Sequence, residues 1–163
     1  MSSGAYLLAH VASQEDLIPA AKQLSEIESV TRWDAVDGHV NIILKTSNIA
    51  EVKAALESVS GIDQTLAYNI TGESGQDVTL DPSLCHAYLF IETEGAKRES
   101  IAKTLKSMTE VVSITSTSGG CDFVVVIKGA TFSAVDHVIN DYIRPLDGVI
   151  RLKHNRIIDL KQL

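Results

Sequence analysis

Histidine and cysteine have the widest chemical range among the side chains of this 163-residue sequence, and they are few. His39 follows a glycine in a polar turn, and Cys85 and His86 are neighbours. These residues could ligate zinc, but zinc sites use paired ligands at short spacings such as CxxC or HExxH, and neither spacing occurs. We therefore expect no metal site, and reduced thiols at Cys85 and Cys121. The other histidines stand singly, at His10, His137 and His154.

Motifs of the common enzyme classes are also missing. The sequence has no Ser-His-Asp order, no phosphate-binding P-loop and no GxGxxG dinucleotide signature. An enzyme without such motifs would need a buried polar group beside a cavity, and the available residues are His10, Trp33 and Asn41. We expect that the chain is not an enzyme and holds no cofactor, with an enzyme kept as an alternative.

The overall charge argues against a direct nucleic-acid partner. Fourteen basic and 21 acidic side chains give a net charge of −7, the wrong sign for following phosphates without a local basic patch. No apolar run approaches the roughly 18 residues of a membrane span, and the start MSSGAYLLAHV lacks the basic and apolar segments of a secretion signal. We expect a cytoplasmic protein that binds neither duplex DNA nor a membrane.

The elements that position these residues come from an internal duplication. The segment AYLL at 5–8 is answered by AYLF at 87–90, 82 positions later. The turn GHVN at 38–41 then faces GGCD at 119–122, 81 positions later. Because self-similarity at a fixed offset indicates repeated units, we predict tandem copies. The predicted organisation is a first repeat over 1–71, a linker over 72–86 and a second repeat over 87–163.

Each copy has the order strand, helix, strand, strand, helix, strand, which is the βαββαβ order of a ferredoxin-like fold. The first copy has predicted strands over 5–11, 30–36, 40–45 and 62–70, around helices with apolar stripes at 17–27 and 52–59. The second copy has predicted strands over 87–93, 111–117, 121–128 and 149–158, around helices near 96–108 and 132–143.

Three local signals support these elements. Pro19 must lie in the first turn of its helix, where a missing N–H costs nothing. Gly38 follows Asp37 in a hairpin signal that supplies a positive φ. Asn48 and Glu51 have the spacing of a capping box at the start of the second helix.

The first strand of each copy is apolar on both sides. In the first copy Leu7 and Ala9 lie on one side, and Tyr6 and Leu8 on the other. The second copy repeats this pattern, so both faces of each sheet must be covered. The sequence predicts an α+β protein of two tandem ferredoxin-like βαββαβ repeats stacked sheet to sheet.

Three segments of the second copy resemble the effector-binding (RAM) domain of the Lrp/AsnC regulators. They are AYLFIET at 87–93, TSGGCDF at 117–123 and YIRPLDGV at 142–149. The resemblance covers 87–160 well and 5–70 more loosely. Because two such domains stack as a dimeric α/β-barrel in that family, the resemblance implies an intramolecular barrel of this kind.

The resemblance also implies a binding site, because effectors of that family bind beside a Gly-x-x-Asp hairpin. The implied effector-binding residues are Gly119, Gly120 and Asp122 in the second copy, and Gly38 and Asn41 in the first. A carboxylate could pair with the ammonium group of an effector, and glycine leaves room for its approach. The alternative is a hairpin residue that bonds its own turn.

The function implied by the resemblance is that of a small-molecule effector-binding, regulatory protein, with an amino acid as the effector. The family's helix-turn-helix has no counterpart, because residue 5 already begins the first strand. The implied partners are a second copy of the chain or full-length Lrp/AsnC-type regulators. The alternatives are a structural, partner-binding module and a dimeric α/β-barrel enzyme.

Overall fold

The structure is a computed structural model that describes residues 4–74 and 80–158. The chain divides into two compact units, each built on one βαββαβ repeat. The predicted fold class, α+β with two tandem ferredoxin-like repeats, is therefore confirmed. Residues 75–79 of the predicted linker lie outside the described residues, as do 1–3 and 159–163. The predicted limits of the repeats and the linker stay predictions.

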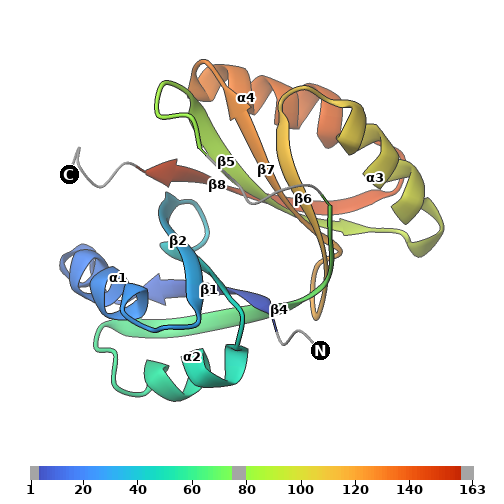
Figure 1. Ribbon diagram of the computed structural model, residues 1–163. Coiled ribbons are helices and arrows are strands. Elements are labelled where there is room, and N and C mark those ends of the chain that lie inside the picture. Colours follow the sequence, from blue (N-terminus) through green and yellow to red (C-terminus); the bar gives the residue numbers. More distant parts are fainter. Residues whose placement is uncertain (1–3, 75–79, 159–163) are drawn as a thin grey trace. The chain divides into compact units, whose positions relative to one another are not determined.

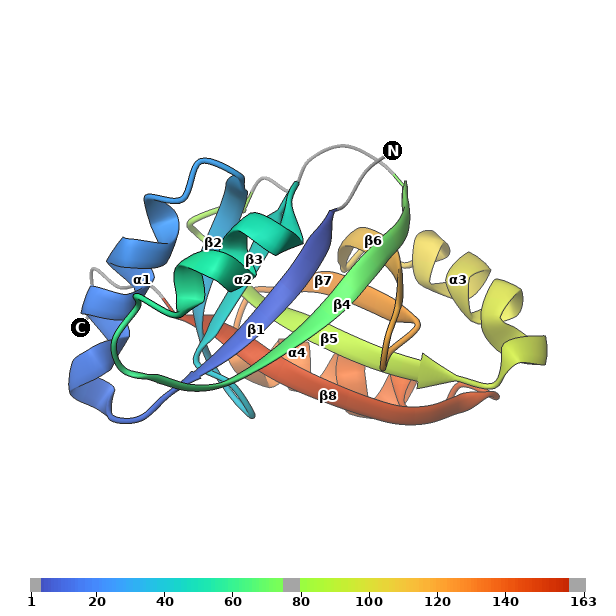
Figure 2. The same cartoon turned by 90° about the horizontal axis from the view of Figure 1, so that it is seen from below.

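The first repeat forms a four-stranded antiparallel sheet with two helices on one face (Figure 1). Strand β1 pairs with both β3 and β4, and β2 pairs with β3, so the strand order is β4-β1-β3-β2. Figure 2 shows β4 lying beside β1. The elements are β1 (Ala5–Val11), η1 (Gln14–Asp16), α1 (Leu17–Ser25), β2 (Val30–Asp37), β3 (Ile42–Thr46), α2 (Ile49–Leu56) and β4 (Ile62–Ser74).

The second repeat has the same topology. Strand β5 pairs with β7 and β8, and β6 pairs with β7, so the order is β8-β5-β7-β6. Helices α3 and α4 cover one face of this sheet. The elements are β5 (Cys85–Thr93), η2 (Gly95–Lys97), α3 (Arg98–Ser107), β6 (Val111–Ser118), β7 (Phe123–Gly129), α4 (Phe132–Val138), the π-helix η3 (Ile139–Ile143) and β8 (Val149–Ile158).

The local signals at the helix starts are largely confirmed. Pro19 is the third residue of α1. The Asn48 side chain caps α2 by accepting a 3.2 Å hydrogen bond from the Glu51 N–H. The reciprocal half of the capping box is not formed, because the Asn48 N–H donates to Thr46 and the Glu51 carboxylate accepts from the Ser29 N–H.

The strand limits differ from the prediction in two ways. Strand β4 continues to Ser74, and β5 begins at Cys85. Strands β3 and β7 each begin two residues later than predicted, at Ile42 and Phe123. The two residues before each strand stay in the hairpin loop, and the second of them, Asn41 or Asp122, donates its N–H to the first strand of the repeat.

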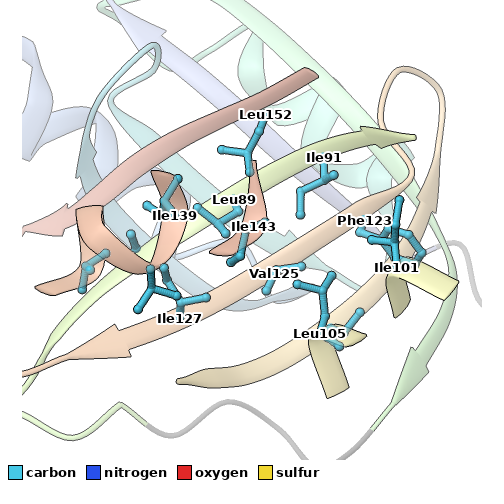
Figure 3. Close-up of a cluster of buried hydrophobic side chains, with 14 residues drawn as sticks. Leu89, Ile91, Ile101, Leu105, Phe123, Val125, Ile127, Ile139, Ile143 and Leu152 are labelled. Atoms are coloured by element: carbon cyan, nitrogen blue, oxygen red, sulfur yellow. The ribbon is translucent and has the colours of Figure 1, made fainter. Parts of the chain in front are cut away.

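Each repeat has a core between its sheet and its two helices. In the second repeat, side chains from β5, β7 and β8 meet those of α3, α4 and η3 (Figure 3). The opposite face is also covered, because Tyr6 and Leu8 in β1, and Tyr88 and Phe90 in β5, are buried. The prediction that both faces of these strands are covered is confirmed.

No helix among residues 4–74 and 80–158 is long and apolar enough to cross a membrane. The cytoplasmic location stays a prediction.

Candidate functional site

The residues of the predicted site lie in two hairpin loops at equivalent places, 38–41 between β2 and β3 and 119–122 between β6 and β7. Gly119 and Gly120 have positive φ angles of 99° and 148°. Gly38 does not have a positive φ, so that part of the hairpin prediction is wrong. His39 stands where the second loop has Gly120, and a positive φ costs a residue with a Cβ about 1–2 kcal/mol. The first loop therefore follows a different backbone path.

The Asp122 carboxylate bonds to donors of its own repeat. Its Oδ2 accepts hydrogen bonds from the backbone N–H of Thr93 at 2.7 Å and from the Thr93 hydroxyl at 3.2 Å. Its Oδ1 lies 3.3 Å from Nη1 of Arg98, whose guanidinium also lies over the Phe123 ring. The carboxylate thus ties the hairpin to the end of β5 and the start of α3. Its pairing with an effector stays a prediction.

Asn41 makes the equivalent connection in the first repeat. Its Oδ1 accepts a 3.0 Å hydrogen bond from the Val11 N–H, at the end of β1. Its own N–H donates to the Ala9 carbonyl at 3.0 Å, as the N–H of Asp122 donates to the Ile91 carbonyl at 2.8 Å. Both loops therefore use the same polar position to attach the hairpin to the first strand of their repeat.

The surroundings of Cys121 in the second loop disfavour its reactive thiolate form. Burial is the main cause that raises the pKa of its thiol to about 11, and the nearby Asp122 carboxylate adds to that rise. The hydroxyl of Thr117 lies 3.2 Å from the sulfur. A thiol with so high a pKa stays protonated at neutral pH, and the thiolate is the reactive form. Cys85 and Cys121 are both free, as predicted.

The three residues considered for an enzyme do not form one site. His10 is exposed, and its Nδ1 lies 2.7 Å from Oδ1 of Asp63. Trp33 packs against the core between the sheet and the helices of the first repeat. Asn41 belongs to the hairpin loop. Within 4–74 and 80–158 there is also no group of three or more His, Cys, Asp or Glu side chains that could hold a metal ion.

The structure assembles a charged cluster that the sequence analysis missed, at the end of β8 in the second repeat. Nη2 of Arg156 lies 2.7 Å from Oδ2 of Asp136, and Nε2 of His154 lies 4.0 Å from Oδ1 of the same carboxylate. Arg144 donates to the Leu152 carbonyl at 3.0 Å, on the same strand. His154 and Arg156 are two residues apart on a strand, so their side chains share a face. That spacing was the available signal.

The surroundings of His154 lower its pKa. Burial is the main cause that lowers the pKa of His154 below its usual value, and the positive charges of Arg144 and Arg156 act in the same direction. The Asp136 carboxylate acts in the opposite direction. The surroundings of His154 therefore favour its neutral form. Titratable groups with shifted pKa values are enriched in functional sites.

The comparisons with known proteins place the second repeat in a family. The Lrp/AsnC ligand binding domain matches residues 86–159. The second repeat belongs to the Lrp/AsnC ligand binding domain family. The predicted resemblance is confirmed. No curated protein matches the chain.

Among solved structures, the siroheme decarboxylase NirDL matches nearly the whole chain. Its TM-score is 0.78 at 8% identity, over 95% of this chain and 71% of the other. The same enzyme in co-complex with an iron-uroporphyrin III analogue has a TM-score of 0.76, with the same identity and coverage. The chain therefore shares the fold of NirDL. AsnC from E. coli is 18% identical with a TM-score of 0.44, over 68% of this chain and 70% of that one.

The likeness to NirDL overturns two predictions. We expected a protein that is not an enzyme and whose main role is effector binding, but the full-length match is to an enzyme. Both predictions are wrong, and the alternative of a dimeric α/β-barrel enzyme is better supported. The missing motifs argue only against the enzyme classes that depend on them.

Proposed function

We propose that this protein is an enzyme that acts on a tetrapyrrole bearing carboxylate side chains, and that the reaction is a decarboxylation. The observation that carries the proposal is the likeness to siroheme decarboxylase NirDL, because it extends over 95% of the chain and so includes both repeats. The co-complex of that enzyme with an iron-uroporphyrin III analogue supports the class of substrate.

The reaction has simple chemical requirements. The bond between a side-chain carbon and its carboxylate carbon breaks, carbon dioxide leaves, and the electron pair left on the side-chain carbon takes up a proton. The site must bind the remaining carboxylates with cationic donors and must supply that proton. The second repeat offers guanidinium groups and a histidine together, at Arg144, Arg156 and His154.

The test is binding and turnover of siroheme by the purified protein. Siroheme is titrated into the full chain, and binding is followed by its visible absorbance. Products are then analysed by mass spectrometry for the loss of carbon dioxide. The fully esterified tetrapyrrole is the matched control, because it has the same ring without carboxylates. We expect binding of siroheme, weaker binding of the ester, and release of carbon dioxide from siroheme alone. Siroheme that binds no better than its ester, or is recovered unchanged, would overturn the proposal.

A further inference from the structure

The cluster of Arg144, His154, Arg156 and Asp136 has the composition of an anion site. It holds two guanidinium groups whose charges both act on His154, against one carboxylate, so it is locally positive in a chain whose net charge is −7. The side chains of Asp136, His154 and Arg156 are 33%, 34% and 40% exposed, so they are partly shielded from water yet accessible. Interactions between charges are stronger at such positions than in bulk water.

An extended helix brings Arg144 to this cluster. Helix α4 continues as the π-helix η3, and the N–H of Arg144 donates to the carbonyl of Ile139, five residues earlier, at 2.8 Å. The Arg144 guanidinium then bonds to the Asn140 side chain at 3.0 Å and to the carbonyl of Leu152. Single π-turns occur often at functional sites, because they redirect side chains that a regular helix would place elsewhere.

The first repeat shows that the fold does not require these charges. In the register of the two sheets, Leu89 pairs with His154 where Leu7 pairs with Ala67. Ala87 likewise pairs with Arg156 where Ala5 pairs with Asn69. Helix α2 ends at Leu56 without a π-helical extension. The same topology therefore folds with small or neutral side chains at these positions, and the cluster is a property of the second repeat.

We propose that Arg144, His154 and Arg156 form a subsite that binds a carboxylate group of the substrate. The inference rests on the proposed function and names where one of the substrate's carboxylates is held. A guanidinium has five N–H donors in a planar fork that matches a carboxylate. Among the described residues, Arg144 donates to Asn140 and Leu152 and Arg156 to Asp136, so both retain donors for a ligand.

Asp136 is the acidic residue of the site. Its Oδ1 is buried and has no hydrogen-bond partner among the described residues, while its Oδ2 is bound by Arg156. Burial is the main cause that lowers the pKa of His154, and the charges of Arg144 and Arg156 add to it. A bound anion would counter these two charges and so raise that pKa, which favours the protonated imidazole. Asp136 Oδ1, 4.0 Å from His154 Nε2, is the nearby acceptor for its N–H. Asp136 is thus a positioning residue for the protonated imidazole.

The test follows the imidazole signals of His154 by NMR in the full chain, with two probes. Citrate is a plain carboxylate probe, and metal-free uroporphyrin III is a tetrapyrrole probe. His154→Gln assigns the signal. Arg144→Gln and Arg156→Gln each remove one charge from the site, and Arg144→Lys keeps the charge without the planar fork. Arg151→Gln is the matched control, because it removes the same charge from the same strand on the opposite face.

We expect both probes to shift the His154 signal toward its protonated position. The dissociation constant should rise about ten- to a hundredfold in each Arg→Gln variant, the loss expected for one charge-assisted hydrogen bond, and should not change in the control. A far-ultraviolet spectrum and a melting curve check that each variant is folded.

The outcomes separate the two proposals. If citrate shifts the signal and uroporphyrin does not bind, the subsite stands and the tetrapyrrole function fails. If uroporphyrin binds, as shown by its fluorescence, and neither probe moves the His154 signal, the tetrapyrrole class of substrate stands and the subsite is wrong. If neither probe has any effect, both proposals are overturned.

Discussion

The two hairpin loops make the same connections with different charges. Asn41 and Asp122 each accept a hydrogen bond from the last residue of the first strand of their repeat. Only Asp122 carries a charge, and only its repeat has an arginine at the first residue of the following helix. The first repeat has the buried Leu17 at that position. The charge of Asp122 is thus balanced by Arg98, within the chain.

The Gly-x-x-Asp hairpin has a structural role that requires no ligand. A carboxylate in a glycine-rich turn has the chemistry of an ammonium site, and the same chemistry serves to hold a backbone N–H. Because the uncharged Asn41 performs the same attachment, the position is explained by the fold in both repeats. The second repeat differs more at its extended helix, where the charged cluster lies.

The largest effect is expected at two glycines that occupy equivalent positions before β4 and β8. Gly61 and Gly148 have φ angles of +89° and +97°. A Cβ added to Gly61 would lie 2.5 Å from the Cβ of Asp16, and one added to Gly148 would lie 2.3 Å from the Cβ of Lys97. Strain and the clash together should make Gly61→Ala and Gly148→Ala each lower the free energy of unfolding by about 2–4 kcal/mol, measured with urea.

Gly95→Ala is the control for this pair, because nothing lies within 4 Å of an added Cβ there. It should change the free energy of unfolding by less than about 0.5 kcal/mol, as exposed substitutions usually do. A large loss at one of the two glycines and none at the other would show that the repeats are not equivalent at this turn.

The next largest loss of stability is expected from substitutions at Asp122 and Asn41 in the two hairpin loops. Asp122→Ala removes the bonds to Thr93 and Arg98 together, and should lower the free energy of unfolding by about 2–3 kcal/mol. Asn41→Ala removes one neutral bond to Val11 and should cost about 1 kcal/mol. Both losses are measured by urea denaturation of the full chain.

Asp122→Asn sharpens this prediction, because it gives the second loop the side chain of the first. It should keep the bond to Thr93 and lose only the pairing with Arg98, which costs less than about 1 kcal/mol at a partly exposed site. Equal losses in Asp122→Asn and Asp122→Ala would mean that the ion pair stabilises the loop, and the hydrogen bond to Thr93 does not.

The sequence predicts the fold well because its signals are local and repeated. Strand β8 occupies 149–158 as expected, since Gly148 ends the preceding segment and an extended apolar pattern follows. The π-helix η3 could not be foreseen, because an apolar stripe is compatible with bonds to the fourth or the fifth residue. The pairing of Arg156 with Asp136 joins residues 20 positions apart, so it depends on how α4 packs on β8.

The smallest effect is expected where the two loops differ only in packing. Cys121 and Val40 occupy equivalent positions and are each 6% exposed. In the first repeat, Val36 stands at the position equivalent to Thr117 and is also buried. The first loop therefore already packs a valine at the position of Cys121. Cys121→Val should therefore change the free energy of unfolding by about 1 kcal/mol or less, since the equivalent position of the first repeat already holds a buried valine and the Thr117 hydroxyl still donates to the carbonyl of residue 121. A thiol reagent at pH 8 should label the partly exposed Cys85 at the same rate in the variant and the native protein, because the buried Cys121 thiol, with its pKa of about 11, stays protonated. A second thiol that reacts in the folded native protein and disappears in the variant would show that the second loop opens in a way that the packing of the first does not predict.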